Sequence, residues 1–280
     1  VIFTYYDPQK TLGALATGIG TVDVFLSPEI PAVTPFTITF AWTSMGDDVV
    51  VDQVPVLVQA APSHEWQVVP LNSTSSSGVP GEALSFGFNL TNLGNAPDTL
   101  TLQPSLAIEA FGDDNALWSA ELVQTSIVGI NETVQVNFSV EVPITAWATT
   151  SANITLAHVA NAYSIGYTHL IIDVDAVSGW RLNLTNADLE VDPAGENLTF
   201  QLAHTGNAYE QPYFAKAGAG WNISLPENAA QVAPYTTTTF DVYVQPPEGS
   251  IAGEVGVLRI RITGNDTSGL VVEEIPVRVG

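Results

Sequence analysis

Cysteine is absent from this sequence of 280 residues, and basic residues are scarce, with 6 Lys and Arg against 29 Asp and Glu. The lack of cysteine excludes a disulfide framework and a thiolate metal site. The formal net charge of −23 leaves too few cations to neutralise phosphates, so we expect no nucleic-acid partner. The same shortage excludes electrostatic docking on anionic lipid.

Long apolar runs are also missing, since no stretch approaches the roughly 18 residues that a membrane-spanning helix needs. We therefore expect no direct membrane insertion in this segment and place any anchor elsewhere. No basic region precedes an apolar stretch, so we expect any targeting signal to have been removed or to lie outside these residues. Hydrophobic residues nevertheless make up 46% of the chain, which excludes a disordered polyanion and predicts a globular protein.

Asparagine is concentrated in Asn-x-Ser/Thr sequons. Nine of the sixteen Asn begin one, whereas with 46 Ser and Thr in 280 residues chance placement gives roughly two or three. The sequons start at Asn72, Asn89, Asn131, Asn137, Asn153, Asn183, Asn197, Asn222 and Asn265. We interpret them as N-glycosylation sites of an exported, extracellular or cell-surface chain. The alternative is that Asn and Ser or Thr co-occur in turns and on the polar faces of strands.

A repeat runs through the chain. Three segments share a pattern of alternating strands that is interrupted near a proline: 21–44, 133–159 and 238–264. From Pro28 to Pro143 is 115 positions and from Pro143 to Pro246 is 103, so the period is roughly 110 residues, which suits one small β-sandwich per repeat.

The upstream half of this pattern occurs only twice. Residues 64–72 match 179–186, and 83–102 match 197–215, which pairs two Gly-Asn-Ala turns, 94–96 and 206–208. The Trp residues recur in the same way, Trp66 with Trp180 and Trp118 with Trp221. We therefore predict a C-terminal portion of a unit over 1–60, and complete Ig-like units over 61–175 and 176–280.

Strands are indicated by alternation with a period of two residues. Leu84, Phe86, Phe88 and Leu90 point one way in 84–90, and the segments 240–244 and 257–262 alternate similarly. Turn residues separate these runs, and no amphipathic helix of ten or more residues is evident. Six or seven short strands per repeat predict an all-β fold of tandem Ig-like β-sandwich domains.

Several of these motifs resemble a known family. GWNISL (220–225), TTTFDVYVQPP (237–247) and GEVGVLRIRIT (253–263) are similar to the NPCBM-associated repeat described beside α-galactosidases. NLTNLGNAPDTLTL (89–102) resembles the opening strand pair of that repeat and of the related CARDB modules. The resemblance implies an extracellular, Ig-like, tandemly repeated module of archaeal and bacterial surface proteins. One departure is Ala-Pro-Tyr-Thr at 233–236, where the family usually has Gly in the turn.

Catalytic and metal-binding signals are weak. The four His residues are far apart, and no nucleophile elbow, phosphate-binding loop or full dinucleotide fingerprint is present, so we expect no enzyme and no required cofactor. One candidate cation site remains, for calcium, at Asp173 and Asp175 between the two complete repeats. Its alternative interpretation is a solvated acidic turn.

The tryptophans allow two interpretations, packing or ligand stacking. Those that recur at equivalent repeat positions favour packing. Trp42 and Trp147 have no counterpart in the last repeat and are the better candidates for a contact surface.

We therefore predict a non-catalytic segment of a secreted or cell-surface protein, acting as a spacer, adhesive stalk or building block of a surface layer or filament. Its expected partners are other surface-protein domains or identical subunits, together with N-linked glycans. Two alternatives stay open: accessory modules of a secreted hydrolase, and a filament subunit that assembles by strand donation.

Overall fold

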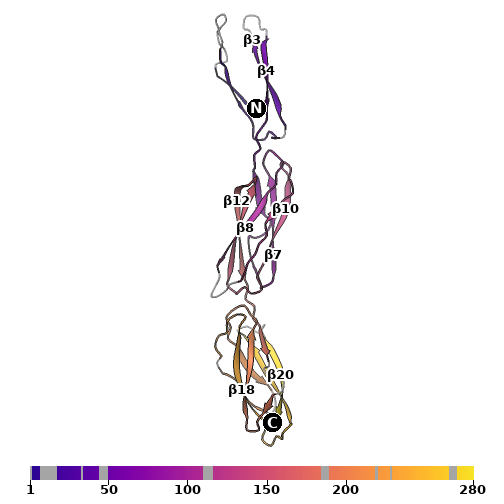
Figure 1. The fold of residues 1–280 in the computed structure, drawn as a ribbon, viewed down its shortest axis with the longest axis vertical. Helices are drawn as coiled ribbons and strands as arrows, with labels where there is room; N and C mark the ends of the chain where they lie inside the picture. The colour runs from indigo at the N-terminus through magenta and orange to yellow at the C-terminus, as the bar shows by residue number, and fades with distance from the viewer. Residues whose placement is uncertain are drawn as a thin grey trace.

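The computed structural model describes residues 2–6, 18–32, 34–43, 50–109, 116–183, 189–217, 220–227, 229–264 and 270–280. Within these ranges every regular element is a β-strand, which confirms the all-β prediction. The strands form successive bodies along one long axis, with β3 and β4 at one end and the C-terminus near the other (Figure 1). The described part of the chain contains no helix of the length and hydropathy that a membrane crossing requires.

Residues 1–60, here called the N-terminal segment, contain two separate antiparallel pairs. β1 (Ile2–Tyr6) pairs with β2 (Thr21–Phe25), and β3 (Phe36–Thr43) pairs with β4 (Val50–Val58). Among the described residues each of these sheets has two strands, and Trp42 of β3 and Val54, Val56 and Leu57 of β4 are exposed.

Residues 61–175, here called the middle unit, form two sheets in the orders β10-β7-β5 and β6-β12-β11-β8-β9. The strands are β5 (Trp66–Pro70), β6 (Ser75–Gly78), β7 (Ala83–Asn92), β8 (Thr101–Glu109), β9 (Val123–Gln124), β10 (Thr133–Glu141), β11 (Ser151–Ala160) and β12 (Tyr163–Val174). β6 joins β12 in parallel, and the other pairs are antiparallel.

Residues 176–280, here called the C-terminal unit, form sheets in the orders β13-β15-β18-β17 and β14-β20-β19-β16. The strands are β13 (Trp180–Asn183), β14 (Glu190–Val191), β15 (Glu196–His204), β16 (Tyr213–Ala217), β17 (Asn222–Ser224), β18 (Thr237–Gln245), β19 (Val255–Thr263) and β20 (Val271–Val279). Again one pair, β14 with β20, is parallel.

Eight described strands per unit exceed the six or seven predicted, because two-residue strands such as β9 and β14 are too short to show alternation. The two units also differ in one strand. In the middle unit, the segment after Trp118 first meets β10 through the bridge Ala120–Val140 and then forms β9, which pairs with β8. In the C-terminal unit, the segment after Trp221 forms β17, which pairs with β18. The strand thus switches sheets in one unit and stays in the other.

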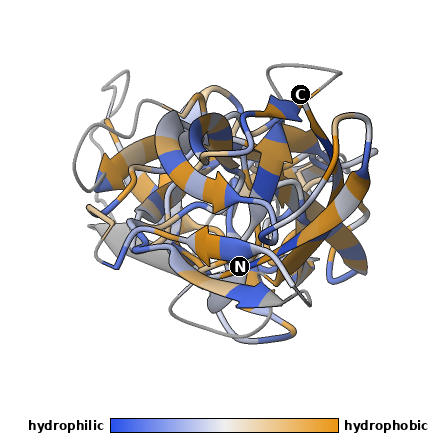
Figure 2. Ribbon diagram, turned by 90° about the horizontal axis from the view of Figure 1, so that it is seen from below, coloured by the Kyte–Doolittle hydropathy of each residue, from blue (hydrophilic) through white to orange (hydrophobic). Residues whose placement is uncertain are grey.

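Alternation closes each sandwich around its own core. Leu84, Phe86, Phe88 and Leu90 of β7 are buried, as the sequence predicts, and Figure 2 shows both orange and blue bands on individual strands. One buried cluster draws on residues 84–174 and the other on 180–277, and they share no residue. Each sandwich therefore has the apolar burial that stabilises a separate domain.

Candidate functional site

The second Gly-Asn-Ala turn, 206–208, binds the linker that precedes the C-terminal unit. Asn207 is buried, and its Nδ2 donates to the carbonyl oxygen of Asp175 over 2.8 Å. Its Oδ1 accepts from the amide of Val177 over 2.6 Å, and its own amide donates to the carbonyl oxygen of Val177 over 3.0 Å. One carboxamide therefore satisfies a donor and an acceptor of the linker backbone, which fixes the path of the linker.

The same asparagine also contacts the preceding unit. The amide of Ala148, in the loop between β10 and β11, donates to the carbonyl oxygen of Asn207 over 2.7 Å. Ala148 is buried. We call this contact between the middle and C-terminal units the second joint.

Aromatic side chains complete the second joint. Trp147 and Tyr209 meet edge to face with ring centroids 5.5 Å apart. The hydroxyl of Tyr235 donates to the carbonyl oxygen of Ala146 over 3.3 Å. Tyr235 has a positive φ of 56°, which is unusual for a non-glycine residue. It stands in the turn 233–236, so a residue in an unusual backbone conformation makes a contact between units.

The first joint, between the N-terminal segment and the middle unit, repeats these bonds. Asn95 Nδ2 donates to the carbonyl oxygens of Ala61 and Ile30 over 3.1 and 3.2 Å. Its Oδ1 accepts from the amide of Ser63 over 2.8 Å, and its carbonyl oxygen accepts from the amide of Ala32 over 2.9 Å. The two joints are thus built by equivalent residues of the repeat.

Glycine is needed at both turns because the linker passes very close to them. A Cβ at Gly94 would lie 2.3 Å from the carbonyl oxygen of Ser63, and one at Gly206 would lie 2.6 Å from that of Val177. Both obstacles are backbone atoms of a linker that is itself held by hydrogen bonds. Any side chain at these positions would therefore displace the linker.

A carboxylate supports the linker of the first joint. Asp98 Oδ2 lies 2.8 Å from Nδ1 of His64 and accepts from Nε1 of Trp66 over 3.3 Å. Partial burial alone would raise the pKa of Asp98, but hydrogen bonds from His64, the Thr99 amide and Trp66 outweigh it and lower the pKa. Asp98 therefore stays ionised at neutral pH and binds the side chains of His64 and Trp66, which lie next to the linker.

Glu210 has the corresponding place in the second joint. Its Oε2 accepts from the hydroxyl of Ser178 over 2.8 Å and lies 3.4 Å from Nε2 of the buried His204. The ring of His204 stacks on Trp180 with centroids 4.2 Å apart. In both joints, an acidic residue three positions after the asparagine therefore contacts side chains next to the linker. The acidic residue belongs to the unit that follows the linker.

Eight of the nine sequon asparagines lie in the described ranges, and none of the eight is buried. Asn72, Asn131, Asn137, Asn197 and Asn222 are exposed, and Asn89, Asn153 and Asn183 are partly exposed. Asn265 lies outside the described residues. An accessible side chain is what glycosylation requires, and N-glycosylation itself stays a prediction.

The two calcium candidates, Asp173 and Asp175, are exposed at the end of β12. The backbone of Asp175 takes part in the second joint through its carbonyl oxygen. In the described residues no group of three or more His, Asp or Glu side chains is arranged to hold a metal ion. Calcium binding at this pair stays an untested prediction.

The recurring tryptophans lie against the two cores, as the packing interpretation predicts. Trp66 and Trp118 pack on the first core, and Trp180 and Trp221 belong to or pack on the second. Of the two tryptophans without a counterpart, Trp147 makes the contact at the second joint, and Trp42 is 54% exposed.

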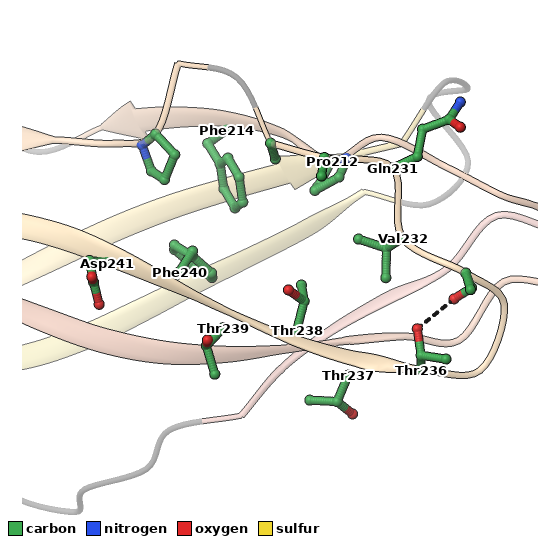
Figure 3. A pocket seen from close by; sticks show the side chains of 14 residues that line it. Pro212, Phe214, Gln231, Val232, Thr236, Thr237, Thr238, Thr239, Phe240 and Asp241 are labelled. Carbon is green, nitrogen blue, oxygen red and sulfur yellow. Dashed lines mark hydrogen bonds between the residues drawn. The ribbon is translucent and has the colours of Figure 1, made fainter.

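A groove of about 600 Å³ lies on the C-terminal unit. Figure 3 shows Phe214 and Phe240 together at one part of it, and the row Thr236 to Thr239 along another. The ring centroids of Phe214 and Phe240 are 4.6 Å apart. Asp241 is the one ionisable side chain among the described residues that line this groove, so it lacks the paired carboxylates of acid–base glycoside chemistry.

Sequence reasoning identified the two Gly-Asn-Ala turns as a repeat but did not assign them a role between units. Their partners, such as Ser63 for Asn95, lie about thirty positions away, so no local pattern reveals the contact. A usable signal was present nevertheless: Asn95 and Asn207 recur at equivalent positions outside any sequon.

No family model matches the sequence, and no curated protein does. The fold is similar to solved β structures at low identity. A Salmonella α2-macroglobulin variant aligns with 87% of this chain, which spans only 18% of that protein, at 12% identity and a TM-score of 0.29. The CupB2 chaperone of Pseudomonas aeruginosa aligns with 74% of this chain and 98% of its own, at 11% identity and a TM-score of 0.24. The titin domains z1z2 align with 78% of this chain and 98% of their own, at 10% identity and a TM-score of 0.26.

Proposed function

We propose that this chain is a non-catalytic segment of a secreted or cell-surface protein and acts as a spacer, an adhesive stalk or a building block of a surface layer or filament. The observation that carries the proposal is the joint, which recurs with equivalent hydrogen bonds at Asn95 and Asn207. A tandem chain whose linkers are tied to both neighbouring units resists bending at each join. Resistance to bending is the property that a spacer needs.

The finer identity is also a proposal. We propose that the units are modules of the NPCBM-associated and CARDB type, that they lie outside the cell, and that they carry N-linked glycans. The absence of cysteine, the excess of sequons and the accessibility of the eight described sequon asparagines support this. Other surface-protein domains or identical subunits are the partners that we propose.

Small-angle scattering of the whole chain tests the mechanical role. A compact protein of 280 residues has a radius of gyration of about 19 Å, whereas a chain held straight at two joints has a much larger one. We expect a value well above the compact one and a scattering profile of an extended particle. A radius of gyration near that of a compact globule would contradict the proposal.

A second candidate, filament assembly by strand donation, is favoured by the N-terminal segment. In the part of this segment that the structure describes, the two sheets have two strands each, and Trp42, Val54 and Leu57 on β3 and β4 are 54%, 41% and 72% exposed. An added strand would pair with a free sheet edge and cover such side chains. Sedimentation at increasing concentration tests it: growth into long assemblies would support strand donation, and a monomer at every concentration would exclude it.

Accessory modules of a secreted hydrolase remain the other alternative. The discriminating observation would be a catalytic domain in the same polypeptide. These units would then attach that domain or space it from its neighbours.

A further inference from the structure

The C-terminal unit has a loop with the same backbone hydrogen bonds as the loops that form the two joints. We call residues 27–34, 143–150 and 247–254 the docking loops. Each contains a first backbone bond, from an amide to the carbonyl oxygen three residues earlier: Ile30 to Ser27, Ala146 to Pro143 and Ser250 to Pro247, over 3.1, 3.0 and 3.2 Å. Each loop also contains a second backbone hydrogen bond of the same kind. The amides of Thr34, Thr150 and Glu254 donate to the carbonyl oxygens of Pro31, Trp147 and Ile251 over 3.4, 3.3 and 3.1 Å.

The correspondence extends to the strand beside the loop. Thr149 and Gly253 both have positive φ, 71° and 89°. Their amides donate to the carbonyl oxygens of Val174 and Val279, the last residues of β12 and β20. Since these bonds match residue by residue, the third loop presents its backbone groups in the same arrangement as the second.

The first two docking loops are occupied, whereas no described residue of the chain occupies the third in this way. The amides of Ala32 and Ala148 donate to the carbonyl oxygens of Asn95 and Asn207, and both alanines are buried. Ala252 occupies the same position, but it is exposed, and no described residue accepts a hydrogen bond from its amide. Ile251, at the position of Trp147, is 73% exposed.

We propose that the loop 247–254 is a docking site for the Gly-Asn-Ala turn of a further sandwich module of this kind. The amide of Ala252 donates to the carbonyl oxygen of the incoming asparagine, and Ile251 packs against that module as Trp147 packs on Tyr209. Both Gly-Asn-Ala turns of this chain are already engaged in the first and second joints, so the occupant is another module. The proposal rests on the joints alone and does not depend on an extracellular location or on the absence of catalysis.

The test appends a second copy of residues 176–280 directly after Gly280. This restores the register of the second joint, because Gly280 follows Val279 as Asp175 follows Val174. Only the original 280 residues carry 15N-labelled alanine, so every alanine amide signal comes from them and none from the appended copy. Hydrogen exchange of the Ala252 amide is then measured in the original and extended chains, with Ala148 as the internal reference.

We expect exchange at Ala252 to slow about ten-fold or more in the extended chain and to approach that of Ala148. The matched control is Asn207→Ala in the appended copy only, which should return Ala252 toward fast exchange. Protected core amides in an appended copy labelled separately report that it has folded. Equal exchange at Ala252 in the original and extended chains, with the appended copy folded, would overturn the proposal.

Discussion

At the scale of single residues, asparagine has two physical roles in this chain. Sequon asparagines such as Asn137 and Asn197 are exposed on strands, whereas Asn95 and Asn207 are buried, and their carboxamides bond to backbone groups. A carboxamide suits the second role because it offers a donor and an acceptor at once. A charged or purely accepting side chain cannot replace it.

Asn207→Asp should loosen the second joint. The aspartate keeps an acceptor for the amide of Val177, but it loses the donor to Asp175 and sets a carboxylate oxygen against that carbonyl. Removing the donor from this part-buried carbonyl and setting a carboxylate oxygen against it should cost about 1–3 kcal/mol, so we expect the Ala148 amide to exchange about 10–100-fold faster. The control Asn197→Asp, on an exposed face of β15, should leave exchange at Ala148 unchanged. A variant Asn207→Asp with wild-type protection at Ala148 would show that the carboxamide does not hold the joint.

His158 should make the middle unit less stable in mild acid. Burial lowers the pKa of His158 below 6.5, and its Nε2 lies 2.9 Å from the hydroxyl of Thr168. The unfolded chain therefore binds more protons than the folded one in this window, and stability falls as the pH drops through 6.5 toward the folded pKa. His158→Gln keeps a polar partner for Thr168 without titrating, so its unfolding free energy should fall less between about pH 7.5 and about pH 5.

The exposed His169, one strand away in β12, supplies the control for this experiment. His169→Gln should keep the pH dependence of the wild type. Chemical denaturation of the three proteins at both pH values is the measurement. The assignment fails if His158→Gln loses as much stability in acid as the wild type.

At the scale of secondary-structure elements, the alternation of single strands predicts the sheets well. The runs within β7, β18 and β19 follow from apolar residues at every second position, and the structure buries those side chains. The route of the strand after Trp118 could not be predicted in this way, because β9 and β17 are two and three residues long. Their choice of sheet depends on which neighbour offers a free edge.

Local preference also fails at Tyr235. Its turn would favour Gly, yet a tyrosine holds the left-handed conformation with φ of 56° and reaches Ala146 in the neighbouring unit. A contact between units has overridden the backbone preference of one residue. The alternation within a unit does not reveal a contact between residues 89 positions apart, so strand patterns predict the sandwiches better than the joints.

The separate cores predict that each sandwich responds to its own substitutions. Leu156 of β11 and Leu258 of β19 are both fully buried, one in each core. Leu156→Ala should lower the stability of the middle unit by about 2–5 kcal/mol and leave the C-terminal unit within about 0.5 kcal/mol. Leu258→Ala should do the reverse. Calorimetry of both variants checks this, and a shift of both thermal transitions by either substitution would mean that the units unfold as one.

At the scale of the whole molecule, stiffness is set by joints in series. Each joint combines a linker held by an asparagine side chain with a direct bond between units, so the loss of both asparagines frees two linkers at once. The acidic surface, with a net charge of −23, keeps such a molecule soluble but acts between like-charged units over only about 10 Å at 0.1 M salt. Bending should therefore depend on the joints more than on charge repulsion.

The double variant Asn95→Ala and Asn207→Ala should bend more than the wild type while each sandwich stays folded. Freed linkers behave as short flexible chains, so we expect the radius of gyration to fall by roughly a tenth to a quarter. Small-angle scattering at two salt concentrations measures it, with Asn137→Ala and Asn197→Ala together as the matched control at exposed positions. If charge repulsion instead kept the molecule extended, the double variant would match the wild type at low salt and contract only at high salt. An unchanged radius at both concentrations would show that the remaining contacts, such as that of Trp147 with Tyr209, suffice to hold the units in line.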